Sequence, residues 1–372
     1  MTKYNAKNER IKHDYARYLE EAKGRDSTTV DRVLKSIDRF ETTTRRRDFK
    51  LFHKEQAVAF KNKLSEDLNA RTGDRLSKAT VYSTLRDLHA FFFWLAREPG
   101  YKSVIRHADA DYFNLSDKEV AVVRARRERP VPSLAQVEHA LACMPSETEL
   151  ERRDRAVLAY AMITCARVAA LASFRLGDVN VAEAYVDQDA RHVQTKFSKT
   201  FRTFFMPVSE LATSIAIDWH TEMIASPLRG PNDPLFPATD MRRNLEGSFV
   251  AIGLARDGWS NSNPIRNIFR KAFAAADLPY FNPHSIRSML VRHIMSLDLP
   301  VEVLKSWSQN LGHQGLLTTL TSYGTVPSDR QGELIRQGLP KAGGSANPKI
   351  DLELIAAVVS ELQQRGFDAA DR

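Results

Sequence analysis

The chain has 372 residues, a formal net charge of +8 and a pI of about 9.4, with 43% hydrophobic and 27% charged residues. This is the composition of a soluble globular protein long enough for two domains, and the modest basic excess is compatible with a polyanionic partner. Two cysteines in apolar helical surroundings, Cys143 and Cys165, favour a reduced chain over a disulfide scaffold, and no apolar run is long enough to span a bilayer. The polar N-terminus lacks the apolar stretch of a signal peptide, so we expect a cytoplasmic protein without a membrane partner.

Three segments in the first third of the chain have the hydrophobic spacing of amphipathic helices: residues 27–41, 54–68 and 76–100. The first opens with a Ser/Thr cap, and the third begins at a capping Ser77 and ends at a Pro-Gly pair. A loop with three consecutive arginines, residues 45–47, separates the first two segments. The apolar positions are Val30, Val33, Leu34 and Ile37; Val58, Leu64 and Leu68; and Val81, Leu85, Leu88, Phe92 and Leu95.

The composition changes at residues 114–132, which are charged and then interrupted by two prolines, as is typical of a linker between domains. The helical pattern returns at residues 133–144 and 152–165. It then gives way to the period of β-strands at residues 184–209, where we expect short strands with a hairpin at Phe197 to Thr200. The expected strand positions are Val193, Phe197, Phe204 and Phe205, with Pro207 as a stop.

From Pro207 onward we expect only helices. The last is an amphipathic helix at 350–364 that follows a flexible Gly/Pro/Ser spacer and has an apolar face of Leu352, Ile355, Val359 and Leu362. The fold class is therefore mainly α with a small antiparallel β-sheet. We divide the chain into an N-terminal extension, a helical domain, a linker, an α+β domain and a C-terminal spacer with helix, at residues 1–27, 28–113, 114–132, 133–340 and 341–372.

One helix start combines features of an anion site. Asn282 suits a helix cap and Pro283 the first helical position, so His284 and Arg287 fall on one face of the first turn. Two cations beside the free N–H groups of a helix start form a phosphate-sized anion site, although a solvated basic face has the same pattern. The apolar stripe on a different side is Ile286, Met289, Leu290, Ile294 and Leu297.

Two further segments place cations where they need a partner. Arg167 lies between an apolar helix and a second apolar helical turn, and an unpaired buried arginine is costly. Lys196, Lys199 and Arg202 surround the predicted hairpin tip, from which an ammonium group can reach into a cleft.

Together with "LGH" at 311–313 and Tyr323, these pieces resemble the tyrosine site-specific recombinases, also called the phage integrase family. The matching pieces are Arg167 in "TCARVAALASFRLGDV", a hairpin lysine ahead of "FFMPV", "HSIR", "LGH" and the late tyrosine, in the family's order over roughly residues 130 to 326. The resemblance implies that residues 28–113 are the family's core-binding domain, with less specific motifs, and that residues 133–340 are its catalytic domain.

The resemblance also implies the roles of the site residues. Two arginines would donate to the non-bridging phosphate oxygens, the tyrosine would attack to form a 3′-phosphotyrosyl link, and no metal or cofactor is then required. The lysine would be the general acid toward the 5′-oxygen, the first histidine the general base, and the second histidine a hydrogen-bond partner of the phosphate. In that order of roles, the catalytic residues are Arg167, Arg287, Tyr323, Lys199, His284 and His313.

Three details qualify this set. Lys199 is preferred to Lys196 because its distance to Pro207 matches the family's spacing. Ala170 stands where the family usually has an acidic residue, so something else must orient Arg167. The gap from "LGH" to the tyrosine is one residue longer than usual.

The implied function is a site-specific DNA recombinase that acts in integration, excision or transposition of a mobile element. Its partners would be double-stranded DNA sites, further copies of itself in a tetramer, and accessory DNA-bending or partner recombinase proteins, with the C-terminal helix docked in trans or in cis. Its DNA contacts, if these are not merely solvated helix faces, would be Lys78, Thr80, Tyr82 and Arg86 on one helix face and Arg124, Arg126, Arg127 and Arg129 along the linker.

Three other functions compete with this one. A type IB topoisomerase uses a similar catalytic set, and an integrase-like DNA-binding protein without catalysis would keep the fold alone. A zinc site at His284, His293 and His313 lacks the spacing of metal ligands.

The region before Ser27 is too short for a separate arm-binding domain, which favours a simpler recombinase.

Overall fold

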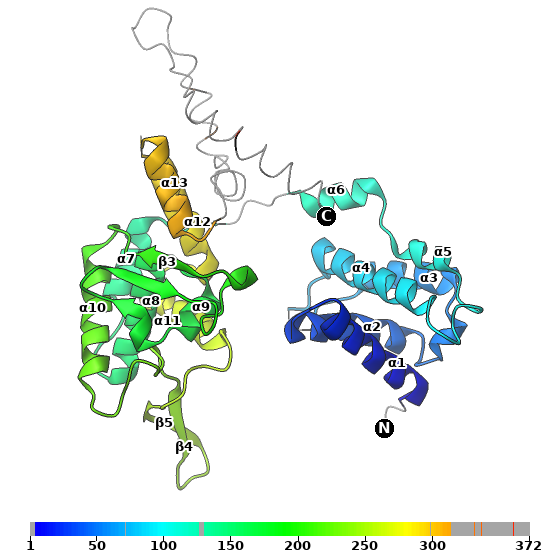
Figure 1. Cartoon of the computed structure of the whole chain (residues 1–372), viewed down its shortest axis with the longest axis horizontal. Helices are drawn as coiled ribbons and strands as arrows, with labels where there is room; N and C mark the ends of the chain where they lie inside the picture. Colours follow the sequence, from blue (N-terminus) through cyan, green and yellow to red (C-terminus); the bar gives the residue numbers. More distant parts are fainter. Residues whose placement is uncertain are drawn as a thin grey trace, which may run out of the picture. The chain divides into compact units, whose positions relative to one another are not determined.

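The computed structural model describes residues 4–70, 72–125, 130–297 and 299–313, together with Gln331, Arg336 and Ser360. The chain forms two compact units, Met1–Arg127 and Glu128–Arg372 (Figure 1). Helices dominate both units and the β-sheets are small and antiparallel, which confirms the predicted fold class. Among the described helices, none combines the length and the apolar character needed to cross a membrane.

All the named elements in the described part of the first unit are helices. Its elements are α1 (Ala6–Arg17), η1 (Tyr18–Ala22), α2 (Ser27–Thr43), η2 (Phe49–Leu51), α3 (Lys54–Glu66), α4 (Lys78–Leu95), α5 (His107–Ala110), η3 (Asp111–Phe113) and α6 (Asp117–Arg124). Ser77 caps α4 as predicted, because its side chain accepts a hydrogen bond of 3.1 Å from the backbone N–H of Thr80. The predicted apolar stripe of α4 is buried.

Two details of the predicted helices in this unit are wrong. The cap of α2 is Asp26 rather than the Ser/Thr pair that follows it, and its carboxylate accepts from the N–H of Thr29 at 2.8 Å. In α3 the buried side chains are Ala57, Phe60 and Leu64, whereas Val58 and Leu68 are exposed. Val58 lies about 100° around the helix from Ala57, and Leu68 follows the end of the helix.

An aromatic cluster forms the core of the first unit. The rings of Phe52 and Phe92 stack with centroids 3.7 Å apart, and Phe40 meets Phe92 edge-on at 5.2 Å. Tyr15 of α1 belongs to the same core, so part of the segment that we set apart as an N-terminal extension packs into this unit. Helix α6 lies within the expected linker and starts with a capping box.

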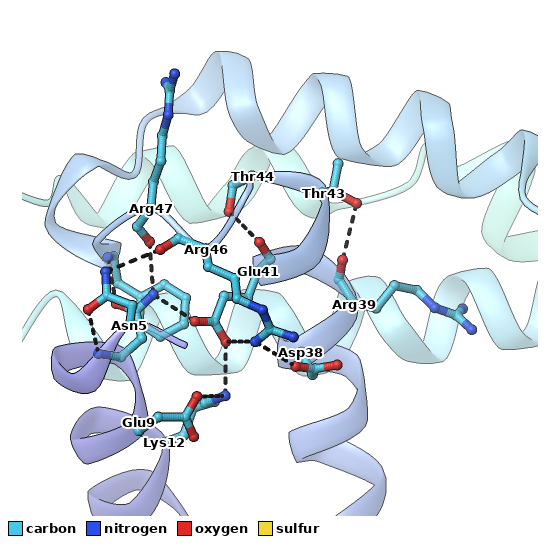
Figure 2. A network of polar contacts seen from close by, with 12 residues as sticks. Asn5, Glu9, Lys12, Asp38, Arg39, Glu41, Thr43, Thr44, Arg46 and Arg47 are labelled. Atoms are coloured by element: carbon cyan, nitrogen blue, oxygen red, sulfur yellow. Dashed lines mark hydrogen bonds and ion pairs between the residues drawn. The ribbon is translucent and has the colours of Figure 1, made fainter. Parts of the chain in front are cut away.

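A buried carboxylate joins α1, α2 and the loop of three arginines (Figure 2). Glu41 is fully buried and accepts hydrogen bonds of 2.9 Å from Lys12 Nζ and from Asn8 Nδ2. Arg46 Nη1 lies 3.6 Å from the same carboxylate, and Asn8 also donates to the backbone oxygen of Arg47 at 2.8 Å. Arg46 is thereby folded toward Glu41, while the side chain of Arg47 points away from the network (Figure 2).

The second unit contains both β-sheets. Its described elements are α7 (Leu134–Ala142), α8 (Glu149–Thr164), α9 (Val168–Ser173), η4 (Leu176–Asp178), β1 (Val179–Asn180), β2 (Tyr185–Gln188), η5 (Lys196–Ser198), β3 (Phe201–Phe204), α10 (Glu210–Ala225), β4 (Thr239–Arg243), β5 (Phe249–Leu254), α11 (Asn263–Ala275), α12 (Pro283–Met295) and α13 (Val301–Asn310). Helix α8 is central: its residues from Ala156 to Thr164 are all buried, and α7, α10, α11 and α12 pack against it.

The three-stranded sheet has the order β1-β2-β3, and β2 pairs with β3 from Tyr185↔Phe204 to Gln188↔Phe201. The predicted tight hairpin at Phe197 to Thr200 is wrong, because a loop of residues 189–200 joins these strands. Phe197 and Ser198 have φ values of 63° and 49°, which a strand does not accommodate. Val193, which we expected on a strand, is buried within this loop.

The expectation of helices alone after Pro207 is also wrong, because β4 and β5 form a second antiparallel hairpin between α10 and α11. The hairpin projects from the rest of its unit (Figure 1), and Met241, Phe249 and Ile252 are exposed on it. A strand pair without a buried face lacks the alternation of apolar and polar residues by which strands are predicted.

The Glu41 network predicts a large difference between two substitutions of glutamate. Glu41→Ala leaves Lys12 without its buried partner, so we expect it to lower the free energy of unfolding of the first unit by about 3–5 kcal/mol. Glu9→Ala removes the other carboxylate on Lys12, at 2.7 Å, but that side chain is partly exposed, and we expect a loss below about 1 kcal/mol. Urea unfolding of both variants measures the difference, and equal losses would contradict this account of the network.

Candidate active site

Helix α12 carries two of the predicted site residues near its start. Pro283 occupies its first turn as predicted, where a missing N–H has no cost. Asn282 stands at the cap position, but its side chain makes no capping hydrogen bond, contrary to our prediction. Its backbone oxygen instead accepts from Ser285 Oγ at 2.6 Å.

Arg287 lies in the buried face of α12, so the prediction that it shares a face with His284, away from the apolar stripe, is wrong. His284 is exposed, whereas Arg287 is only 3% exposed. Seven residues make nearly two turns, which places Arg287 within about 20° of the buried Ile294. Leu297, the last expected member of the stripe, lies beyond the end of the helix and is exposed.

The guanidinium of Arg287 joins three segments of the second unit. Nη1 donates to the backbone oxygen of Cys165, and Nη2 donates to that of Leu311 at 2.7 Å. Nη2 also lies 3.2 Å from Nε2 of His313. Its Nε is buried without a hydrogen-bond partner among the described residues, so one strong donor is left for an anion.

Arg167 is placed by the end of α8. Cys165 has a left-handed backbone with φ 52°, which ends the helix and turns the chain, and Arg167 then occupies the cap position of α9 with its side chain half-buried. Burial raises the pKa of the Cys165 thiol to about 11, while the charges of Arg287 and Arg167 act in the opposite direction. Both guanidinium groups therefore lie within electrostatic range of the same buried group.

Lys199 lies in the loop of residues 189–200, two residues before the start of β3. Its side chain is half-buried, and burial followed by the positive charge of Arg167 lowers its pKa. Lys196 is exposed, with its ammonium 4.8 Å from the ring centre of Phe197. Of the two candidate lysines, Lys199 thus has the environment that makes an ammonium group a better acid.

His313 contacts Arg287 and is influenced by the charges of the other cationic side chains of the site. It is 9% exposed, and burial lowers its pKa to about 3, with further lowering by Arg287, Arg167, Lys199 and Lys196 in that order. The ring is therefore neutral near pH 7. Because arginine can only donate, Nε2 accepts from Arg287 and the ring proton is assigned to Nδ1.

The end of α13 is clamped to β3, and sequence reasoning missed the residue responsible. The N–H of Phe204 donates to Asn310 Oδ1 at 2.7 Å, and Asn310 Nδ2 donates to the oxygen of Phe204 at 2.9 Å. Gly312 follows with φ 67°, and a Cβ there would lie 2.5 Å from Cζ of Phe201. These contacts hold His313 beside the strand that follows Lys199.

The structure thus brings together Arg167, Lys199, Arg287 and His313, and places His284 on the exposed side of the same helix as Arg287. Tyr323 lies outside the described residues, as does the helix expected at 350–364 apart from Ser360. Within the described part of the chain, no group of three His, Cys, Asp or Glu residues has the arrangement of a metal site. The arrangement concentrates positive charge and donors around a neutral histidine, which suits a phosphate group.

The predicted DNA-binding face on α4 is only partly open. Lys78, Thr80 and Arg86 are exposed and Tyr82 is half-buried, but the Thr80 hydroxyl lies 2.8 Å from that of Ser77 and takes part in the helix cap. Arg124 is exposed at the end of α6, whereas Arg126, Arg127 and Arg129 lie outside the described residues.

A cation of α2 that sequence reasoning missed also reaches this face of α4. Arg32 Nη1 donates to Ser83 Oγ at 2.9 Å and to Asp87 Oδ2 at 2.6 Å. The sequence holds no signal for it, because the partners are more than fifty residues away.

Comparison with known proteins relates this chain to others through its structure. No family model and no curated protein matches the sequence. Among solved structures, a lambda integrase dimer bound to a COC′ core site is similar, with a TM-score of 0.54, 14% identity, and coverage of 85% of this chain and 94% of that one. The Tn1549 transposon integrase in complex with transposon right end DNA has a TM-score of 0.52, 14% identity, and coverage of 88% and 99%. The chain therefore has the fold of the tyrosine recombinases.

The lowered pKa of His313 predicts how stability depends on pH. The unfolded chain binds a proton at this histidine below about pH 6.5, but the folded chain does so only near pH 3, so the unfolded state binds more protons in between. The contribution of His313 to the free energy of unfolding should therefore be fully present above about pH 6.5. It should decrease as the pH drops toward 3, by up to about 1.4 kcal/mol per pH unit. Urea unfolding of the wild type and of His313→Gln measures this, since the variant should lack this part of the slope. Parallel profiles would show that His313 is not buried in its neutral form.

Proposed function

We propose that this chain is a site-specific DNA recombinase that cleaves and rejoins strands through a 3′-phosphotyrosyl intermediate at Tyr323. One observation carries the proposal: a buried Arg287 is joined to His313 in a site that also feels the charges of Arg167 and Lys199. The fold of the tyrosine recombinases supports the same conclusion. Integration, excision or transposition of a mobile element is the event we propose for it.

The two arginines would stabilise the charge that develops during attack. A pentacoordinate phosphorus places negative charge on two non-bridging oxygens, and planar guanidinium donors match that geometry. Arg287 brings its unpartnered Nε, already fixed by bonds from its other nitrogens to two backbone oxygens. The neutral ring of His313 would add its Nδ1–H as a donor to the same phosphate.

The covalent step exchanges one phosphate ester for another. The oxygen of Tyr323 forms a bond to phosphorus, the bond from phosphorus to the 5′-oxygen breaks, and the leaving oxygen takes a proton from Lys199. The lowered pKa of Lys199 favours that donation. A tyrosine hydroxyl has a pKa near ~10, and His284, exposed on α12, would accept its proton. The reverse sequence with a new 5′-hydroxyl rejoins the strand.

The remaining parts of the proposal concern assembly. Residues 28–113 would bind DNA as the core-binding domain, residues 133–340 would carry catalysis, and the protein would act in the cytoplasm on DNA. Self-association into a tetramer on two DNA sites is part of the proposal; one structure of similar fold, with a TM-score of 0.53 and 14% identity, is a lambda integrase tetramer bound to a Holliday junction. A type IB topoisomerase and a catalytically silent DNA-binding protein are the alternatives.

The nucleophile is tested by substitution. Tyr323→Phe should bind DNA as the wild type does but form no covalent adduct, because the attacking oxygen is absent. The assay uses nicked duplexes that carry candidate element ends, in buffer with EDTA, and measures the adduct on a denaturing gel. Tyr280→Phe is the matched control, since Tyr280 is an exposed tyrosine of the same unit, and its adduct should be unchanged. An adduct formed by Tyr323→Phe would assign the attack to another residue.

The general acid is tested with a modified leaving group. Lys199→Ala should cleave ordinary DNA slowly, by a factor of about 10²–10⁴, because the 5′-oxygen leaves without a proton. A substrate with a 5′-bridging phosphorothiolate has a sulfur leaving group that needs no proton, so it should restore cleavage. Lys196→Ala is the comparison, and we expect little change with either substrate. Rescue in the Lys196 variant instead would move the role to that residue.

A further inference from the structure

We infer that His192 is a positioning residue that holds Lys199 in the active site, an inference that rests on the proposed function. The loop of residues 189–200 carries Lys199, and a loop of twelve residues between two short strands has much conformational freedom. In this structure its first half is fixed to the segment that follows Arg167. The ring of His192 makes the principal side-chain contact of that attachment.

The contact joins His192 to a carboxylate that is itself immobilised. Nε2 of His192 donates to Oδ1 of Asp178 at 2.6 Å. The second oxygen of Asp178 accepts from the backbone N–H of Arg175 at 2.8 Å, and the residue is 8% exposed. Because both carboxylate oxygens are engaged, Asp178 offers a fixed point on η4 against which the loop is held.

A second attachment lies two residues further along the loop. The backbone N–H of Gln194 donates to Ser173 Oγ at 2.8 Å, and that hydroxyl donates in turn to the backbone oxygens of Ala169 and Ala170 at 3.0 Å. Ser173 belongs to α9, the helix whose cap position is Arg167. The loop of the candidate general acid is therefore fastened to the helix of the first catalytic arginine.

The far side of the loop is closed at β3. The N–H of Ala190 donates to Thr200 Oγ1 at 3.0 Å, just beyond the last strand pair, Gln188↔Phe201. Between these two ends the side chain of Val193 is buried. Residues 189–194 and 200 are thus anchored, and only residues 195–199 are left between anchors. The His192–Asp178 contact limits where Lys199 can lie relative to Arg167.

The contact of His192 is with Asp178, so the inferred effect of His192 on the reaction passes through the loop that carries Lys199. Its loss should leave DNA affinity unchanged and slow only the step in which Lys199 gives up a proton. A displacement of about 1 Å of a catalytic group lowers a rate by up to about 10²-fold. We therefore expect His192→Ala to cleave ordinary DNA about 10- to 100-fold more slowly.

The experiment measures single-turnover cleavage by the full chain on ordinary DNA and on the 5′-bridging phosphorothiolate. With the sulfur leaving group, His192→Ala should cleave at close to the wild-type rate. On ordinary DNA, His192→Gln should cleave faster than His192→Ala and more slowly than the wild type, because the glutamine amide nitrogen reaches a position similar to that of Nε2. The double variant His192→Ala with Lys199→Ala should be no slower than Lys199→Ala alone, since both changes remove the same step.

His220→Ala is the matched control for a merely structural loss. His220 is buried and its ring lies 3.1 Å from the oxygen of Leu176, two residues from Asp178 in the chain. This variant should lower the melting temperature, and any loss of its rate should be equal on both substrates. His192→Ala overturns the inference if it cleaves ordinary DNA at the wild-type rate, or if sulfur rescues Lys199→Ala but not His192→Ala. Absence of a tyrosyl adduct in the wild type would overturn the proposed function itself, and the inference with it.

Discussion

The buried guanidinium of Arg287 is the constraint on which the candidate site depends. A cation at this depth is costly unless its donors are matched, and Nη1 and Nη2 of Arg287 donate to backbone oxygens from the end of α8 and from the turn after α13, while Nε has no partner among the described residues. The same group contacts His313. Three segments must therefore sit in one arrangement for the charge to be tolerated, and that arrangement is the site.

The positive charges of the site oppose one another when no anion is bound. Burial and then the charge of Arg167 lower the pKa of Lys199. Burial and then the charges of Arg287, Arg167 and Lys199 lower the pKa of His313. Contacts of other groups stabilise the fold against this repulsion. They are the hydrogen bonds of Asn310 to β3, the close approach of Gly312 to Phe201, and the attachment of the loop of residues 189–200 through His192. A bound phosphate would relieve this repulsion. The fold therefore holds the cations in an arrangement that favours anion binding.

Sequence patterns correctly predicted features that depend on neighbouring residues in the chain. The cap at Ser77, the stripe of α4, Pro283 in the first turn of α12 and the overall fold class follow from spacing and residue type. Patterns failed where distant segments decide: helical spacing predicts that Arg287 shares a face with His284, away from the apolar stripe, because the partners that bury Arg287 are elsewhere in the chain. The β4–β5 hairpin was missed because it has no buried face, and the loop of residues 189–200 because positive φ at Phe197 has no residue signature.

The candidate site also depends on contacts between segments that are synthesised far apart in time. Arg287 reaches back 122 residues to Cys165, and Asn310 reaches back 106 residues to Phe204. The first unit has a core of its own and can fold as soon as it leaves the ribosome. The second unit cannot bury Arg287 until the turn after α13 has been synthesised. A nascent or prematurely terminated chain thus presents a folded N-terminal unit before the candidate site of the second unit has formed, so the direction of translation sets the order in which the two units can fold.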